Sequence, residues 1–196
     1  MDAALDEFTM KSYENASLNK IIKNTGISKG TFYYHFQDKK ALYIFLQDSA
    51  HKTQVEFMKN RMKELSEEFN EKDIFETIKL QTQIGVEFTI AHPKYLKLIT
   101  NYLKETETPK NKKILEYINN NRKQTIETGM DMMITKAIEH GDFKDEFSKE
   151  FIIKIINHLF LNYTEIFPTE ENYEMQKYIE DINTFIDFLK YGLGKE

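Results

Sequence analysis

The stretch of sequence that decides the fold is Ser17-Leu-Asn-Lys-Ile-Ile-Lys-Asn-Thr-Gly-Ile-Ser-Lys-Gly-Thr-Phe-Tyr-Tyr-His-Phe36. Its apolar residues Leu18, Ile21 and Ile22 have the spacing of one buried face of an amphipathic helix. Ser17 is a suitable N-cap for that helix. Gly26 comes where the helix should end, since glycine tolerates the left-handed conformation of a helix C-terminus. The stretch therefore predicts a helix over residues 17–25, followed by a tight turn.

A short second helix is predicted over residues 29–36, directly after the turn. Ser28 is its N-cap, and Phe32 and Phe36, four residues apart, give it a buried face. We expect Ile27 to insert its side chain from the turn into the core. Two helices joined by such a turn are typical of the helix-turn-helix, whose second helix lies in the major groove of DNA.

The opposite side of this second helix carries side chains suited to contact with DNA. Lys29 can reach a phosphate or a guanine edge, and Thr31 can bind a phosphate or touch a thymine methyl group. Gly30 would let the backbone approach the duplex. Flat rings with polar tips suit the sugar–phosphate backbone, and these belong to Tyr33, Tyr34 and His35. Packing against the preceding helix is an alternative role for the two tyrosines.

A third helix is predicted to begin at Lys39, with Asp38 as its cap. Lys39 and Lys40 fall in its first turn, where a positive charge opposes the helix dipole by about 0.3–1 kcal/mol. This local cost favours phosphate contacts over two surface lysines that are merely tolerated. Residues 16–40 hold five lysines against one aspartate, a local net charge of +4 in a chain of net charge −5. The basic patch that DNA binding requires is therefore present.

With these residues the sequence resembles the N-terminal domain of TetR-family transcriptional regulators. The resemblance covers about residues 3–46 and is carried by Ala3-Ala4-Leu5, Phe8, Tyr13, Ser17-Leu18, Ile21, Gly26 to Phe36, and Lys39. A weaker similarity, at Ala137-Ile-Glu-His-Gly-Asp-Phe143, resembles the junction before the dimerisation helices of many members.

The resemblance implies an all-helical homodimer. Each subunit would have a three-helix DNA-binding head and a helical body that binds a ligand and dimerises. The resemblance also implies phosphate contacts for Ser17 and Lys39, and a recognition surface of Lys29, Gly30, Thr31, Tyr33, Tyr34 and His35.

Three positions depart from the family pattern. The chain starts with Met1-Asp2 almost inside the first helix, so we expect no minor-groove contact from a basic N-terminal extension. Ala16 stands where threonine is frequent, which removes one possible phosphate ligand. Ser12 stands at a frequent glycine position, so the turn before Tyr13 is expected to be slightly rearranged.

Composition excludes several classes of protein. Without cysteine, the chain has no disulfide, thiol nucleophile or thiolate zinc site. No run approaches the roughly 20 apolar residues of a membrane span, and no signal peptide is visible, so we expect a soluble cytoplasmic protein. Glycine-rich phosphate loops and His-Glu-x-x-His are absent from the sequence. We therefore expect no enzyme, no cofactor and no metal site.

The rest of the chain also reads as helical, because its three prolines fit helix boundaries and no strand alternation is present. The predicted fold class is all-α, with about nine helices. Residues 1–46 would form the helix-turn-helix DNA-binding domain, and residues 47–196 the helical effector-binding and dimerisation domain. The further helices are expected at about 2–13, 39–66, 71–91, 94–105, 110–140, 148–167 and 171–192.

The last two predicted helices carry apolar stripes wider than one packing partner requires. The first stripe contains Phe147, Phe151, Ile155, Ile156, Leu159, Phe160, Tyr163 and Ile166, and the second contains Tyr173, Tyr178, Ile179, Ile182, Phe185, Ile186, Phe188 and Leu189. Two such helices from each of two subunits would form a four-helix homodimer interface with two-fold symmetry. A purely intramolecular core is the alternative.

Between the head and that interface we expect an effector pocket, framed by helices within residues 55–163. Methionines and aromatic residues suit an adaptable apolar cavity. The candidate lining residues are Phe88, His92, Tyr95, Tyr102, Met130, Met133, His158 and Asn162. Ordinary core packing is the alternative for each of them, and His158 could equally lie in the dimer interface. Because no cluster of like charges accompanies them, we expect an apolar or aromatic effector.

These features favour a ligand-responsive transcriptional regulator, most simply a repressor. Its homodimer would bind a palindromic operator and be released by a small-molecule effector. Two alternatives belong to other classes. One is a helical small-molecule-binding or enzymatic bundle with a vestigial helix-turn-helix, and the other is an architectural DNA-binding protein without a ligand.

Overall fold

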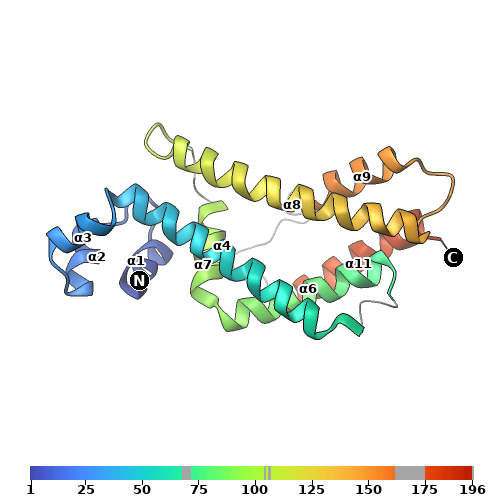
Figure 1. Cartoon of the computed structure of the whole chain (residues 1–196), viewed down its shortest axis with the longest axis horizontal. Helices are drawn as coiled ribbons and strands as arrows, with labels where there is room; N and C mark the ends of the chain where they lie inside the picture. The colour runs from blue at the N-terminus through green and yellow to red at the C-terminus, as the bar shows by residue number, and fades with distance from the viewer. Residues whose placement is uncertain (68–71, 104, 106, 162–174, 196) are drawn as a thin grey trace. The chain divides into compact units, whose positions relative to one another are not determined.

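The computed structural model describes residues 1–67, 72–103, 105, 107–161 and 175–195, with the side chains of 103, 121–128, 160, 161 and 175 left aside. In this part of the chain the regular structure is helical, apart from one isolated bridge between Phe143 and Gly194. The all-α prediction is therefore confirmed. The helices are α1 (Asp2–Met10), α2 (Leu18–Thr25), α3 (Lys29–His35), α4 (Lys39–Glu64), α6 (Ile74–Ala91), α7 (Pro93–Leu103), α8 (Lys112–His140), α9 (Lys149–Leu161) and α11 (Met175–Leu193) (Figure 1).

The predicted helix limits agree closely with the structure where capping residues mark them. α2 and α3 begin and end within one residue of the prediction. α8 ends before Gly141, whose φ of 88° is readily adopted only by glycine. α1 ends at Met10 rather than near residue 13, because Lys11 is already extended. The predicted helix end at residue 167 lies outside the described residues, as do Asn162, Tyr163, Ile166 and Tyr173.

The chain divides into two compact units. Unit 1 contains Met1–Lys59 and Glu87–Arg122, and unit 2 contains Asn60–Val86 and Lys123–Glu196. The functional boundary that we expect at residue 46 is a different division and stays a prediction.

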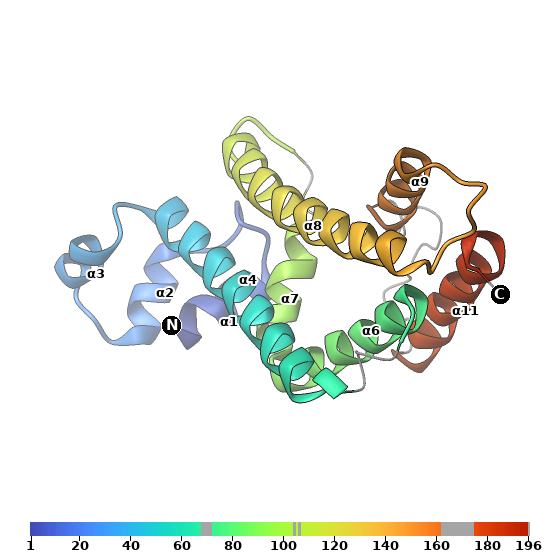
Figure 2. The same ribbon diagram turned by 45° about the vertical axis from the view of Figure 1, so that its right-hand side comes forward.

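Unit 1 has a core that joins the three N-terminal helices to α4, α7 and the start of α8. α1 packs on both α2 and α7 (Figure 2). The buried residues of this core are Ala4, Leu5, Phe8, Ala16, Ile21, Ile22, Phe32, Leu42, Tyr43, Leu46, Ala50, Leu98, Tyr102, Ile114, Leu115 and Ile118. The helix-turn-helix is therefore not an isolated module, because its core continues into α7 and α8.

Unit 2 has its own core, built from α6, the later part of α8, α9 and α11. Ile152 and Ile156 of α9 and Ile182 and Ile186 of α11 are buried in it. Part of the apolar stripes thus serves an intramolecular core, as the alternative reading allowed. Among the described residues, no helix has both the length and the apolar character needed to cross a membrane.

Candidate nucleic-acid interface

The caps of α3 are formed by the residues that the sequence indicated. The Ser28 hydroxyl accepts a hydrogen bond from the Thr31 backbone N–H at 3.0 Å. The Phe36 N–H donates to the Phe32 carbonyl at 2.9 Å, so Phe36 is the C-cap. Phe32 is 3% exposed, and the centres of the Phe32 and Phe36 rings are 5.7 Å apart. These two rings attach the short helix to the core of unit 1.

The six residues predicted to form the recognition surface are all exposed: Lys29, Gly30, Thr31, Tyr33, Tyr34 and His35. Tyr34 is 85% exposed, so packing against the preceding helix does not occur for this residue. Tyr33 is 55% exposed and its ring lies edge-on to that of Phe32, with centres 5.2 Å apart. The structure thus brings a lysine, a threonine and three polar rings to the surface of one short helix.

The turn between α2 and α3 differs from the prediction at one residue. Gly26 adopts φ 69° and donates its N–H to the Lys23 carbonyl, as a helix-ending glycine should. Ile27, however, is 41% exposed, so our expectation that it enters the core is wrong. The core of unit 1 takes up Ile22 and Phe32 instead, and Ile27 lies between the cap residues Gly26 and Ser28.

A buried carboxylate joins α1 to α2. The Glu7 side chain is 3% exposed and forms ion pairs with Lys11 at 2.8 Å and Lys20 at 2.9 Å. It also accepts a hydrogen bond from the Ser17 N–H at 3.1 Å. The hydrogen bonds from Lys11 and Lys20 lower the pKa of Glu7 to about 2. We missed this role, although a carboxylate between Leu5 and Phe8 on an apolar helix face was a usable signal.

Ser17 and Lys39 both have structural partners. The Ser17 hydroxyl caps α2 by accepting from the Lys20 N–H at 3.3 Å. The Lys39 ammonium donates to the backbone carbonyls of Tyr13, Glu14 and Ala16 at 2.7, 3.1 and 3.0 Å. Burial lowers the pKa of Lys39. The phosphate contacts expected of Ser17 and Lys39 remain predictions.

The segment between α7 and α8 is bonded to the segment that follows α1. The Glu105 carboxylate accepts from the Tyr13 N–H at 2.7 Å, from the Tyr43 hydroxyl at 3.3 Å and from the Asn111 amide at 3.4 Å. The Thr108 hydroxyl donates to Glu14. These bonds connect two segments about ninety residues apart in sequence.

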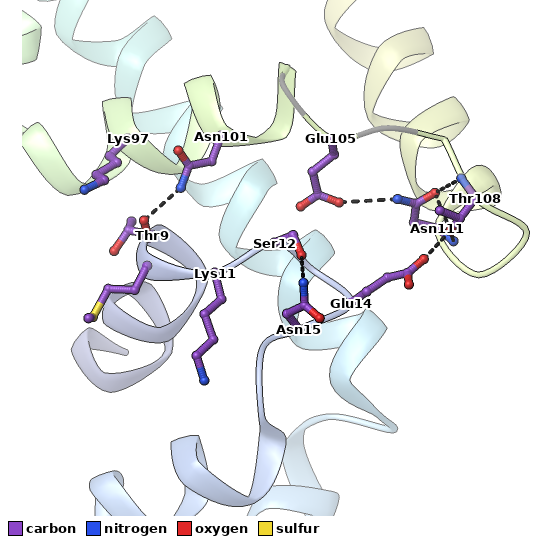
Figure 3. A pocket seen from close by; sticks show the side chains of 11 residues that line it. Thr9, Lys11, Ser12, Glu14, Asn15, Lys97, Asn101, Glu105, Thr108 and Asn111 are labelled. Carbon is purple, nitrogen blue, oxygen red and sulfur yellow. Dashed lines mark hydrogen bonds between the residues drawn. The ribbon is translucent and has the colours of Figure 1, made fainter. Parts of the chain in front are cut away.

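An open groove of about 760 Å³, lined mostly by polar residues, lies beside these contacts in unit 1 (Figure 3). Side chains from α1, the segment after it, α7 and the segment between α7 and α8 line it, among them Asn101, which donates to the Thr9 carbonyl at 2.8 Å. None of our candidate effector residues lines this groove. The sequence led us to expect an apolar cavity, and the polar residues of this groove form no local pattern that would predict it.

The candidate effector residues fall in both units. In unit 1, Phe88, His92 and Tyr95 form one ring cluster with Phe57, with neighbouring ring centres 5.0 to 5.9 Å apart. Tyr102 is buried, with its hydroxyl 3.3 Å from the Leu115 carbonyl.

In unit 2, Met130 and Met133 are partly buried against the core, and His158 is exposed on α9. Asn162 is not among the described residues. A role for these eight residues in effector binding stays a prediction.

Comparison with known proteins agrees with this geometry. Residues 1–44 match the family described as "Bacterial regulatory proteins, tetR family". Over 190 residues the chain is 27% identical to the uncharacterized HTH-type transcriptional regulator YerO of Bacillus subtilis (strain 168). This match covers 96% of the chain but 62% of YerO, so the chain spans less than two thirds of that relative's length.

Two further similarities concern a short part of the sequence and the fold. The chain is 40% identical to the biofilm operon icaADBC HTH-type negative transcriptional regulator IcaR of Staphylococcus aureus (strain Newman) over 43 residues. This match covers 22% of the chain and 23% of IcaR. The crystal structure of a TetR family transcriptional regulator from Chloroflexus aurantiacus J-10-FL superposes with a TM-score of 0.58 at 19% identity, covering 100% of this chain and 91% of that one.

The fold and the exposed face of α3 define an all-helical helix-turn-helix protein. Within this class, residues 1–44 match the TetR family of bacterial regulatory proteins, and the fold is similar to that of a TetR family transcriptional regulator.

Proposed function

We propose that this protein is a ligand-responsive transcriptional repressor that binds a palindromic operator as a homodimer. The observation that carries the proposal is the exposed polar face of α3 above the buried Phe32. A short helix anchored from below and exposed above can enter a major groove without rearrangement. The similarity of 43 residues to a negative transcriptional regulator favours repression over activation.

Dimerisation through the last two helices is supported by apolar side chains on their outer faces. Phe151 of α9 is 46% exposed, and Phe188 and Tyr191 of α11 are 71% and 80% exposed. Large exposed apolar side chains on adjacent elements often mark an interface. A two-fold dimer would present two copies of α3 to two half-sites, and a palindromic operator follows from that symmetry.

An effector would act by favouring a conformation that does not fit the operator. We propose that it is apolar or aromatic, that it binds the helical body, and that it tilts α4 and so changes the spacing of the two heads. The ring cluster of Phe57, Phe88, His92 and Tyr95 supports an aromatic site beside α4. A hundredfold preference for the released state would supply about 2.7 kcal/mol, enough to empty an operator.

A gel-shift titration on the intergenic DNA upstream of the gene tests the proposal. The wild type should shift this fragment selectively, while Tyr33→Ala should bind it at least about tenfold more weakly. Tyr117→Ala is the matched control, since Tyr117 is an exposed tyrosine of α8 away from α3. Equal binding by the wild type and Tyr33→Ala, or no selective shift by the wild type, would refute the proposed role of α3.

A further inference from the structure

The position of Lys39 suggests a role other than the expected phosphate contact. A lysine ammonium has three N–H donors, and here three carbonyl oxygens accept from it, those of Tyr13, Glu14 and Ala16. The ammonium also lies 4.7 Å from the centre of the Tyr13 ring, within the range of a cation–π contact. Each of its donors is therefore already used within the chain.

These three carbonyls belong to the segment between α1 and α2, residues 11–17, which contains no helix and so needs partners for its backbone groups from elsewhere. Two carboxylates hold its N–H groups, since Glu7 accepts from Ser17 and Glu105 accepts from Tyr13. Lys39 holds its carbonyls. The segment is thus fixed by charged side chains from α1, from the first turn of α4 and from the segment after α7.

We propose that Lys39 is a positioning residue for DNA binding, whose ammonium fixes the α1–α2 segment and thereby the placement of α2 and α3. This inference rests on the proposed function, because the placement of α3 matters only if α3 enters a groove. The link from the segment to α3 is short, since α2 has eight residues and only Gly26 to Ser28 separate it from α3.

The geometry explains why lysine suits this position better than arginine. Three acceptors converge on one nitrogen, which matches a compact ammonium. A guanidinium spreads its donors over a planar fork and cannot direct three of them to one point. At a phosphate contact the preference reverses, because arginine binds phosphate at least as well as lysine. Lys39→Arg therefore separates the two roles.

The test measures operator affinity between 50 and 200 mM salt, roughly the range in which phosphate contacts dominate the response. The proteins are the wild type, Lys39→Met, Lys39→Arg, Lys29→Met and Lys29→Arg, at a temperature where circular dichroism shows all of them folded. Lys113→Met is the neutral control, since Lys113 is exposed on α8.

We expect Lys39→Met and Lys39→Arg to bind the operator about tenfold more weakly than the wild type. The slope of log Kd against log salt concentration should be the same for these variants as for the wild type. Lys29→Met should lower that slope by about 0.9, the loss of one phosphate contact, and Lys29→Arg should bind like the wild type. A slope lowered by about 0.9 in Lys39→Met, with normal binding by Lys39→Arg, would overturn the inference in favour of a phosphate contact. Unchanged affinity together with a lower melting temperature would also overturn it, since Lys39 would then only stabilise the fold.

Hydrogen exchange in the absence of DNA provides a second readout. The amides of Tyr13, Ala16 and Ser17 are bonded in the structure and should exchange faster in both Lys39 variants than in the wild type. Unchanged exchange at these amides would contradict the proposed fixing of the segment. If the wild type fails to bind DNA at all, the proposed function fails, while exchange still decides whether Lys39 fixes the segment.

Discussion

The carboxylate of Glu7, 3% exposed, lies 2.9 Å from the ammonium of Lys20 and connects α1 to the first turn of α2. The same carboxylate accepts a hydrogen bond from the backbone N–H of Ser17, and Ser17 is the N-cap residue of α2. A single buried acid therefore fixes the start of the helix that precedes α3, and the stability of the head depends on the charge of Glu7.

Acid should weaken the head through Glu7. Its pKa falls from 4.5 to about 2 on folding, so its ionised form stabilises the native state above pH 4.5, and this contribution is lost as the pH falls from about 4.5 towards 2. Glu7→Gln should cost about 1.5–3 kcal/mol at pH 7, the range for hydrogen bonds to charged groups. Urea unfolding of both proteins at pH 7 and pH 3 measures the difference, which should shrink at pH 3. A difference that is equal at both pH values would contradict this role.

Two neighbouring aromatic residues of α3 should respond in opposite ways to truncation. Phe32→Ala should destabilise the protein by about 3–5 kcal/mol, because Phe32 is 3% exposed and fills the core. Tyr34→Ala should change the stability by less than about 0.5 kcal/mol, because Tyr34 is 85% exposed, yet should weaken operator binding. Thermal unfolding and gel shift measure both effects. A large loss of stability in Tyr34→Ala would contradict its exposure.

Glu105 should stabilise unit 1 through its three acceptor contacts. Glu105→Gln removes the charge and one acceptor position, and we expect a loss of about 1–2 kcal/mol in urea unfolding. Glu107→Gln is the matched control, because Glu107 forms only an exposed ion pair with Lys112 at 3.4 Å among its described contacts. Equal stability of the two variants would show that the contacts of Glu105 contribute nothing measurable.

The outer face of α11 should control the oligomeric state. Sedimentation velocity should find a wild-type dimer and a monomer for the double variant Phe188→Glu and Tyr191→Glu, because charges in the interface would be desolvated. Ile90→Glu is the control, since Ile90 is 76% exposed on α6 and lies outside the proposed interface. A double variant that stays dimeric would place the interface elsewhere.

Local signals in the sequence predicted the helix-turn-helix well. Ser17, Gly26 and Ser28 act as caps within their own turns, so residue type and spacing were enough to find the helix ends. The failure at Ile27 has a tertiary cause, because the packing of the helices, and no local pattern, decides which apolar side chains enter the core.

The charged contacts around the head were beyond sequence reasoning. Lys39 and Tyr13 are 26 residues apart, and Glu105 and Tyr13 are 92 apart, so no local pattern connects them. From the sequence, Lys39 was interpreted as a surface cation at the start of a helix. Its hydrogen bonds to backbone carbonyls depend on the packing of α1 against α4, which the sequence does not reveal. The apolar stripes of α9 and α11 were visible in the sequence, but which residues face inward was not.

DNase I footprinting of the wild-type protein on the upstream intergenic DNA tests the central claim most directly. The account predicts a protected region containing two inverted half-sites whose centres are about 34–36 Å apart along the duplex, or a multiple of this distance. The protection should disappear with Tyr33→Ala at the same protein concentration. Absence of any protected region, with the protein folded and dimeric, would contradict the claim that α3 binds DNA.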